Sequence, residues 1–380
     1  MNLRKSRFAW LIAILASISL LAAACGDDDS DSGDGDTESE SSGDGEESEG
    51  GGDLSGTLVG AGASSQAAAM QGWQAGFQEL NPDVTVEYDP IGSGGGRETF
   101  TSGGSDFAGS DSLLDDEEYE ASVEACAGDQ GAIHLPMYIS PVAVAYNLPG
   151  VDSLNLSPEA LAGIFAGEIT EWTDEAIVAD NPDADLPDMT INAVHRSDES
   201  GTTENFTDYL GTVAPDLWTY GEVGEWPIDS GEGAAQTSGV VAAITAGEGS
   251  IGYADASQIG DLGVVAVGVG DSFVEYSPEA AAKLVDVSER VDGRSEFDLG
   301  FELTRDTEED GVYPIALVSY HIVCLEYDDA ETAELVTEFM TYVSSEDGQA
   351  ASAESAGSAP ISDDLRAQIE DSIAQITSAS

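Results

Sequence analysis

The sequence predicts an α/β protein that is built from two lobes. Short apolar runs alternate with amphipathic segments along most of the chain, which is typical of strands alternating with helices. The 380 residues exceed what one hydrophobic core usually supports. Two long apolar runs, 132–146 and 312–324, lie on either side of a middle section with its own strands and helices. We therefore expect a chain that leaves lobe 1, builds lobe 2 and returns to complete lobe 1.

Residues 1–24 are typical of a secretory signal peptide. Arg4, Lys5 and Arg7 precede an apolar run that is too short and too abruptly terminated for a stable membrane span. The ending LLAAAC resembles a bacterial lipobox, with Ala22 where Leu is usual. This predicts cleavage before Cys25 and a diacylglycerol on its thiol. The alternative is ordinary signal cleavage, with Cys25 incidental.

Residues 25–53 are expected to be the lipidated Cys25 followed by a disordered acidic tether. From 26 to 53 the chain contains only Gly, Ser, Thr, Asp and Glu, so it has no apolar side chain that could enter a core. The fold is expected to begin near Leu54. Two acyl chains on Cys25 would hold the protein at a membrane without a spanning helix.

The charge balance excludes one class of function. The chain has 75 acidic and 10 basic residues, for a formal net charge of -65. Such a protein is repelled by nucleic acid, so polynucleotide binding is not expected. The hydrophobic content of 41% is nevertheless enough to build a core.

Lobe 1 is expected to comprise 54–140 and 312–380. A helix at 64–80 carries Met70, Trp73, Phe77 and Leu80 at helical spacing. The other elements expected in this lobe, in chain order, are a strand at 56–62, a strand at 84–88, a glycine loop at 91–96, a short helix at 97–102, a strand at 107–109, and helices at 331–343 and 363–376.

Lobe 2 is expected to comprise 141–311. Its periodic segments predict three helices and three strands, again in alternation. The helices are expected at 158–165, 202–210 and 234–245, and the strands at 190–194, 250–253 and 263–269. The two long apolar strands would then connect the lobes.

Four short polar loops follow predicted strands or precede predicted helices. They span 60–65, 91–96, 107–111 and 196–202, and they contribute hydroxyls, glycine amides and one guanidinium, that of Arg196. Helix N-termini expose free amides at the positive end of the helix dipole, and glycines allow a ligand to approach the backbone. Taken singly these loops are ordinary turns. Together they predict a small oxyanion pocket.

The order of these loops resembles the phosphate-binding proteins of phosphate ABC transporters (PstS type). The motifs are LVGAGAS, YDPIGSGGG, DFAGSD, LAGIFAGEITEWTDEAI, HRSDESGTT and WPIDSGEGAAQTSGVVAAITAGEGSIGYAD. The resemblance implies a two-lobed periplasmic-binding-protein-like (type II) fold with two hinge-crossing strands. It also implies a receptor that captures inorganic phosphate for membrane-embedded permease subunits, with no catalysis, cofactor or metal.

The resemblance also implies which residues contact phosphate. The contacts carried over are Ser64, Ser65, Ser93, Asp111, Arg196, Ser200, Gly201 and Thr202, with Asp198 orienting Arg196. Phosphate near neutral pH retains a proton that an ionised Asp111 can accept, whereas sulfate is fully ionised. Sites built to hydrogen-bond a group reject analogues that lack it. We therefore expect Asp111 to select phosphate over sulfate.

The chain departs from the family pattern at two positions. The first loop usually continues with Phe-Pro, whereas this chain has Ser65-Gln66, so the stiff residues that fix the loop are missing. Glu199 stands where a small residue is common. An inward-pointing carboxylate would reduce anion affinity, so we expect Glu199 to face solvent.

Cys126 and Cys324 follow the signal peptide and so meet an oxidising compartment, where two free thiols would be a liability. We expect a disulfide between them. The alternative is a zinc site with His134 and His321. In a strand, however, His321 and Cys324 are an odd number of residues apart and face opposite sides.

Three other classes of function make different demands on the sequence. A receptor for another oxyanion, such as sulfate, molybdate or tungstate, would use a similar pocket but would have no use for Asp111. A secreted phosphatase-like enzyme would need a nucleophile elbow or metal-ligand clusters, and the sequence shows neither spacing. A surface adhesin would leave the pocket residues without a purpose.

Overall fold

Residues 54–291 and 294–379 are described by a computed structural model. The predicted signal peptide, Cys25 and the tether lie outside the described residues. Among the helices of the described residues, none has the length and apolar character needed to span a bilayer.

Lobe 1 contains a mixed sheet with parallel and antiparallel pairs. Strand β1 (Gly56–Gly62) lies between β2 (Val84–Asp89) and β3 (Phe107–Ser110), parallel to both. Strand β13 (Ala316–Cys324) runs antiparallel to β3 and to β4 (Ala132–Asn147). The helices of this lobe are α1 (Ala67–Leu80), α2 (Ser93–Thr101), α3 (Asp116–Ala125), α9 (Ala330–Ser344), α10 (Glu346–Ala356) and α11 (Asp363–Ile373), and strands β14 (Glu326–Tyr327) and β15 (Thr377–Ser378) pair beside them.

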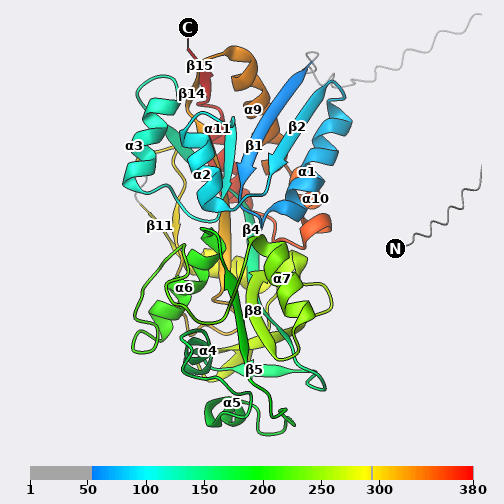
Figure 1. The fold of residues 1–380 in the computed structure, drawn as a ribbon. Coiled ribbons are helices and arrows are strands. Elements are labelled where there is room, and N and C mark those ends of the chain that lie inside the picture. The colour runs from blue at the N-terminus through cyan, green and yellow to red at the C-terminus, as the bar shows by residue number, and fades with distance from the viewer. Residues whose placement is uncertain (1–53, 292–293, 380) are drawn as a thin grey trace, which may run out of the picture. The chain divides into compact units, whose positions relative to one another are not determined.

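The spacing of apolar residues in α1 predicted the face that it buries. Met70, Trp73 and Phe77 are buried, whereas Leu80, at the end of the helix, is 67% exposed. The same helix lies beside α10 in Figure 1. Gly72 allows this approach, since a Cβ there would lie 2.6 Å from Ser355 Oγ.

Lobe 2 is organised around β8 (Ser250–Asp255), which runs antiparallel to the second half of β4. Strand β6 (Asn192–Arg196) pairs in parallel with β8 and with β7 (Glu232–Ala234). Strand β9 (Gly263–Val269) joins β4, β5 (Leu154–Leu156) and β10 (Ser272–Val274). The helices are α4 (Pro158–Phe165), α5 (Glu175–Asp180), α6 (Gly201–Val213), α7 (Gln236–Ala246) and α8 (Pro278–Val287), with a 3-10 turn η1 (Ala256–Gln258) after β8.

Strand β4 connects the two lobes. Its residues 132–141 pair with β13, and its residues 142–147 pair with β8 (Figure 1). The returning chain contacts it at the change of partner, where Val142 N donates to Ile315 O at 2.7 Å. Tyr313 Oη also donates to Val142 O at 3.0 Å. The two predicted apolar runs are therefore adjacent at the crossing.

The segment between α8 and the crossing reaches both lobes. It contains strands β11 (Glu289–Arg290) and β12 (Phe301–Glu302), which pair with each other. Asp298 accepts hydrogen bonds from the backbone nitrogen and the ring Nδ1 of His134, which belongs to lobe 1. The segment that we assigned to lobe 2 thus also contacts lobe 1.

Helices α3, α5, α8 and α10 were not expected from the sequence. In α3 only Ser122 is buried, so the helix has no apolar stripe; the capping box formed by Asp115 and Glu118 fixes its start instead. In α10 the buried residues are Gly348, Gln349, Ser352 and Ala356, so its contact face is made of small and polar residues. Periodicity of apolar residues cannot reveal such helices.

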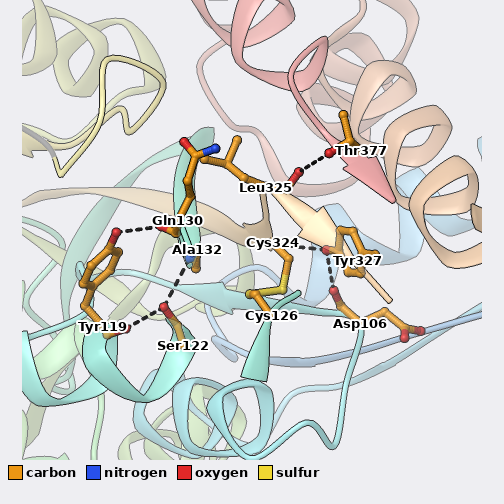
Figure 2. Close-up of a disulfide and its surroundings, with 10 residues drawn as sticks. All are labelled: Asp106, Tyr119, Ser122, Cys126, Gln130, Ala132, Cys324, Leu325, Tyr327 and Thr377. Carbon is orange, nitrogen blue, oxygen red and sulfur yellow. Dashed lines mark hydrogen bonds between the residues drawn. A yellow bond between two sulfur atoms is a disulfide. The ribbon is translucent and has the colours of Figure 1, made fainter. Parts of the chain in front are cut away.

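Cys126 and Cys324 form a disulfide at the end of α3 and of β13 (Figure 2). Their Cα atoms are 5.5 Å apart, and 198 residues separate them in sequence. In the chain-entropy model, a loop of this length contributes about 5 kcal/mol to stability. Tyr327 supports the site, because its hydroxyl accepts from Cys324 N and donates to Asp106 O (Figure 2). Neither sulfur is available for the alternative zinc site.

Candidate functional site

The four predicted polar loops meet between the lobes. A Cβ on Gly201 of lobe 2 would lie 2.8 Å from both Ser93 Oγ and Asp111 Cβ of lobe 1. Ser64 Oγ lies 3.0 Å from Thr237 Oγ1, again across the two lobes. All of the predicted contact residues are buried, namely Ser64, Ser65, Ser93, Asp111, Arg196, Ser200, Gly201 and Thr202.

Helices α1, α2, α6 and α7 begin at this cluster. The sequence placed a short helix at 97–102, after the glycine loop, but α2 begins at Ser93 and includes Gly94 to Gly96. Glycine is a poor helix former, yet close packing requires it here, because a Cβ on Gly96 would lie 2.3 Å from the Cα of Gly62. Helices α6 and α7 begin at Gly201 and Gln236. Their N-terminal amides create an electropositive environment that suits an anion.

Arg196 is the cation of this cluster, and Asp198 orients it. Its Nε donates to Asp198 Oδ1 at 2.8 Å, and a second N–H donates to Oδ2. Asp198 also accepts from the backbone nitrogen of Gln236 at 3.0 Å. Burial raises the pKa of Asp198, but its hydrogen bond to Arg196 and the charge of Arg196 outweigh burial and leave the pKa below its ordinary value.

Asp111 accepts hydrogen bonds from three hydroxyls. Its Oδ1 accepts from Ser65 at 2.6 Å and from Ser319 at 2.5 Å, and its Oδ2 accepts from Thr202 at 2.8 Å. The only proton of the Thr202 hydroxyl is thus given to Asp111. The backbone amide of Thr202 remains as a donor at the start of α6.

The hydroxyls of Ser93 and Ser200 each accept a backbone hydrogen bond. Ser93 Oγ accepts from Asp111 N at 3.1 Å, and Ser200 Oγ caps α6 by accepting from Thr203 N at 3.3 Å. A hydroxyl that accepts can still donate its own proton. Both residues therefore keep a proton that an oxyanion could accept.

Several residues of the cluster were not expected from the sequence. Thr237 bonds Ser64, and its place in the first turn of the helix predicted at 234–245 was the one available signal. Asn205 donates to the backbone oxygens of Asp111 and Gly201, both at 2.8 Å. Gln258 of η1 donates to Ser64 O at 2.8 Å. Each of these three side chains bonds a residue that is distant in sequence, so no local pattern reveals the contact.

In the first loop, where the family pattern has Phe-Pro, this chain has Gln66, and its side chain forms hydrogen bonds to another strand. The side chain is completely buried, and its Nε2 donates to Ser319 Oγ at 2.5 Å and to Tyr320 O at 3.3 Å. The first loop is therefore tied to β13 by hydrogen bonds.

Arg97 is a second buried cation near the cluster. It forms ion pairs with Glu118 of lobe 1 at 2.8 Å and with Glu199 of lobe 2 at 2.9 Å. Glu199 is half exposed, as expected for a side chain facing solvent, but it also bonds Arg97. This ion pair holds the Glu199 carboxylate against Arg97.

A cavity of about 720 Å³ adjoins the cluster at Asp111. Of the predicted contact residues, only Asp111 lines it. Its other charged lining residues are Asp115, Glu204, Asp208, Glu222, Glu289, Glu302, Arg305 and Asp306. This lining is strongly acidic, so the cavity itself is not suited to an anion.

The chain is similar to known proteins over most of its length. Residues 47–347 match the family model described as the PBP superfamily domain. Phosphate-binding protein PstS3 of Mycobacterium bovis is 34% identical over 361 residues, covering 89% of this chain and 90% of the relative. Phosphate-binding protein PstS 3 of Mycobacterium leprae is 37% identical over 291 residues, covering 75% of this chain and 78% of the relative.

Solved structures show the same fold. A phosphate-binding protein from Stenotrophomonas maltophilia superposes with a TM-score of 0.64 at 20% identity, covering 83% of this chain and 94% of the other. A periplasmic phosphate-binding protein bound with phosphate, PfluDING, gives 0.66 at 24% identity, covering 83% and 93%. These likenesses establish the two-lobed type II fold that the sequence predicted. Together with the identity to the mycobacterial relatives, they show that the chain belongs to the PstS family of phosphate-binding proteins within the PBP superfamily.

Proposed function

We propose that this protein captures inorganic phosphate outside the cytoplasm and delivers it to the permease of an ABC transporter. The relatives named above are phosphate-binding proteins, and none is named as an enzyme. In this proposal the two lobes close over the anion, because each lobe supplies part of the contact set. The proposed contacts are Ser64, Ser65, Ser93, Asp111, Arg196, Ser200, Gly201 and Thr202, with Asp198 orienting Arg196.

The proposal depends chiefly on one observation, that the buried guanidinium of Arg196, several helix N-termini and the Asp111 carboxylate belong to one buried cluster where the two lobes meet. Arg196 is 2% exposed and has one carboxylate partner, Asp198. Charge-assisted hydrogen bonds and helix amides would then bind the anion over short distances. No positive surface is required, which suits a chain with a net charge of -65.

The hydrogen bonds of Asp111 favour binding of phosphate over binding of a fully ionised oxyanion. A carboxylate that receives three hydroxyl protons acts as an acceptor, so it favours a ligand that can donate. Phosphate retains a proton near neutral pH and sulfate does not. Sulfate would place a second negative charge against Asp111 without a hydrogen bond.

Calorimetric titration of protein stripped of bound ligand tests this proposal. Phosphate and sulfate are added separately in the same buffer. We expect tight one-to-one binding of phosphate and no heat from sulfate. Equal binding of both would make the protein a general oxyanion receptor, and binding of neither would remove the transport function.

We also propose a lipid anchor at Cys25, on the strength of the sequence LLAAAC. The anchor would keep the folded part near the permease while the acidic tether holds it away from the lipid. Wild-type protein expressed in a bacterium should fractionate with membranes, and Cys25→Ser should be released or retained as an uncleaved precursor. Mass spectrometry of an unmodified mature Cys25 would contradict the anchor.

A further inference from the structure

A buried chain of hydrogen bonds runs from Asp111 into the core of lobe 1. Asp111 Oδ1 accepts from Ser319 Oγ at 2.5 Å, and Ser319 Oγ accepts from Gln66 Nε2 at 2.5 Å. Gln66 Oε1 lies 3.0 Å from His321 Nε2. Gln66, Ser319 and His321 are all completely buried. None of these three residues belongs to the proposed phosphate contacts.

The carbonyl group of Tyr320 fixes the direction of this chain. Its oxygen lies 3.3 Å from Gln66 Nε2 and can only accept, so the NH₂ group of the amide must face it. The second amide hydrogen then points to Ser319 Oγ. Because Ser319 accepts this hydrogen, its own hydroxyl proton is directed to Asp111. The amide orientation therefore follows from the chemistry of its neighbours.

The far end of the chain is a neutral imidazole. His321 lies among aromatic rings, with ring centroids 5.4 Å from Trp73 and 5.4 Å from Phe107. Burial lowers the pKa of His321 to about 3, so the ring carries one proton at neutral pH. Nε2 lies beside Gln66 Oε1 and Nδ1 lies 3.1 Å from Met340 Sδ; because the amide oxygen is the stronger acceptor, the proton is placed on Nε2. Every hydrogen in the chain is thus donated toward Asp111.

The chain determines what Asp111 can still bind. A carboxylate has about four acceptor positions. Ser65 and Ser319 occupy Oδ1, and Thr202 occupies one position of Oδ2. The position that remains is on Oδ2, which lies on the side of Thr202 and the α6 N-terminus. A ligand proton would be accepted there.

We propose that Gln66 and Ser319 are positioning residues that hold Asp111 as a hydrogen-bond acceptor and thereby set the preference for an oxyanion that carries a proton. The inference rests on the proposed function and names residues that control its selectivity without touching the ligand. Removing the Ser319 donor would leave one acceptor position of Asp111 Oδ1 unfilled and would loosen the hold on the carboxylate that faces the ligand proton.

The test compares Ser319→Ala, Ser319→Thr and Gln66→Met in the full folded protein. Phosphate affinity is measured by calorimetry and sulfate affinity by competition against phosphate, and the readout is the ratio of the two dissociation constants. A hydrogen bond to a charged group is worth roughly tenfold or more in an equilibrium constant. We expect Ser319→Ala to reduce the phosphate preference about tenfold. Ser319→Thr should restore it, and Gln66→Met should have a smaller effect.

Ser352→Ala is the matched control, because Ser352 is equally buried in α10 and its hydroxyl bonds Ser358 at 2.6 Å. It should leave the ratio unchanged even where it lowers the melting temperature. A wild-type ratio in folded Ser319→Ala overturns the inference. If that variant does not fold, a wild-type ratio in Gln66→Met has the same meaning. Wild-type protein that binds no phosphate would instead remove the proposed function.

Discussion

Arg196 and Arg97 are both buried near the interface of the lobes, and their surroundings differ. Arg196 is 2% exposed and forms an ion pair with one carboxylate, Asp198. Arg97 is 4% exposed and has three carboxylates within 3.6 Å, those of Glu118, Glu199 and Glu204. The charge of Arg196 is matched one to one, whereas that of Arg97 is outnumbered. Burial alone therefore does not identify the cation that could bind an anion.

The difference assigns separate roles to the two side chains. A bound anion near Arg196 would lie beside the neutral ion pair of Arg196 and Asp198 and beside helix amides. The same anion near Arg97 would meet an excess of negative charge. Arg97 instead links lobe 1 to Glu199 and Glu204 of lobe 2. We infer that Arg196 contributes to affinity directly and that Arg97 acts only by stabilising lobe contact.

Replacing each arginine with methionine tests this contrast and should give the largest effect. Truncating one partner of a buried, hydrogen-bonded charge pair typically costs 2 to 5 kcal/mol. Arg196→Met removes the cation and leaves Asp198 without its charged partner, so we expect phosphate affinity to fall about 100-fold or more in calorimetric titration. Arg97→Met should weaken binding by less than about tenfold, mainly through faster dissociation. Equal losses in the two variants would contradict the contrast.

Asp111→Asn should give the next largest effect, because it removes the carboxylate that we propose accepts the ligand proton. An amide can donate a hydrogen bond as well as accept one. Phosphate should therefore bind about tenfold more weakly, and the gap between phosphate and sulfate should narrow. The measurement is the pair of dissociation constants in one buffer. An unchanged preference would remove Asp111 from the selective role.

The sequence predicted the loops of the site better than their connections. Residues 60–65, 107–111 and 196–202 were recognised because each follows a predicted strand and contains glycine or hydroxyl side chains. The partners of these loops were not recognised, since Gln66 and Ser319 are 253 residues apart and Ser64 and Thr237 are 173 apart. No local pattern encodes such pairs.

The bounds of helices and strands were also predicted well where they depend on local sequence and poorly where they depend on packing against a distant residue. Strand 56–62 and helix 158–165 were predicted with the bounds that the structure shows. The predicted start of α2 at residue 97 was wrong, because the glycines of 94–96 are typical of a loop in the sequence. Only the close packing of Gly96 on Gly62 explains why they are helical. The Phe-Pro departure likewise had no interpretation until Gln66 was seen bonded to β13.

Glu204 provides a smaller test at the Arg97 cluster. Burial raises the pKa of Glu204 to about 7, although Arg97 opposes the shift. A carboxyl with a raised pKa in the folded state contributes stability below its unfolded pKa, near 4.5, and this is lost as the pH rises through 7. Between pH 5.5 and pH 8 the free energy of unfolding should therefore decrease less in Glu204→Gln than in the wild type, by on the order of 1 to 2 kcal/mol.

Urea denaturation of the wild type and the variant at both pH values measures this difference. Glu338→Gln is the control, because it removes the same formal charge from an exposed position on α9. The control should retain the wild-type slope of stability against pH. Equal slopes in wild type and Glu204→Gln would show that the Arg97 cluster is charge-balanced in solution.

The smallest expected effect is that of neutral salt on phosphate affinity. The chain carries a net charge of -65, so its long-range field opposes the approach of an anion. At physiological ionic strength the screening length is about 8 Å, so added salt weakens this repulsion more than it weakens short hydrogen bonds from Arg196 and helix amides. Phosphate affinity should be constant or rise slightly between low and high concentrations of sodium chloride. A steep fall would mean that distant positive charge attracts the ligand, and Arg97 would then have to contribute to binding despite its three carboxylates.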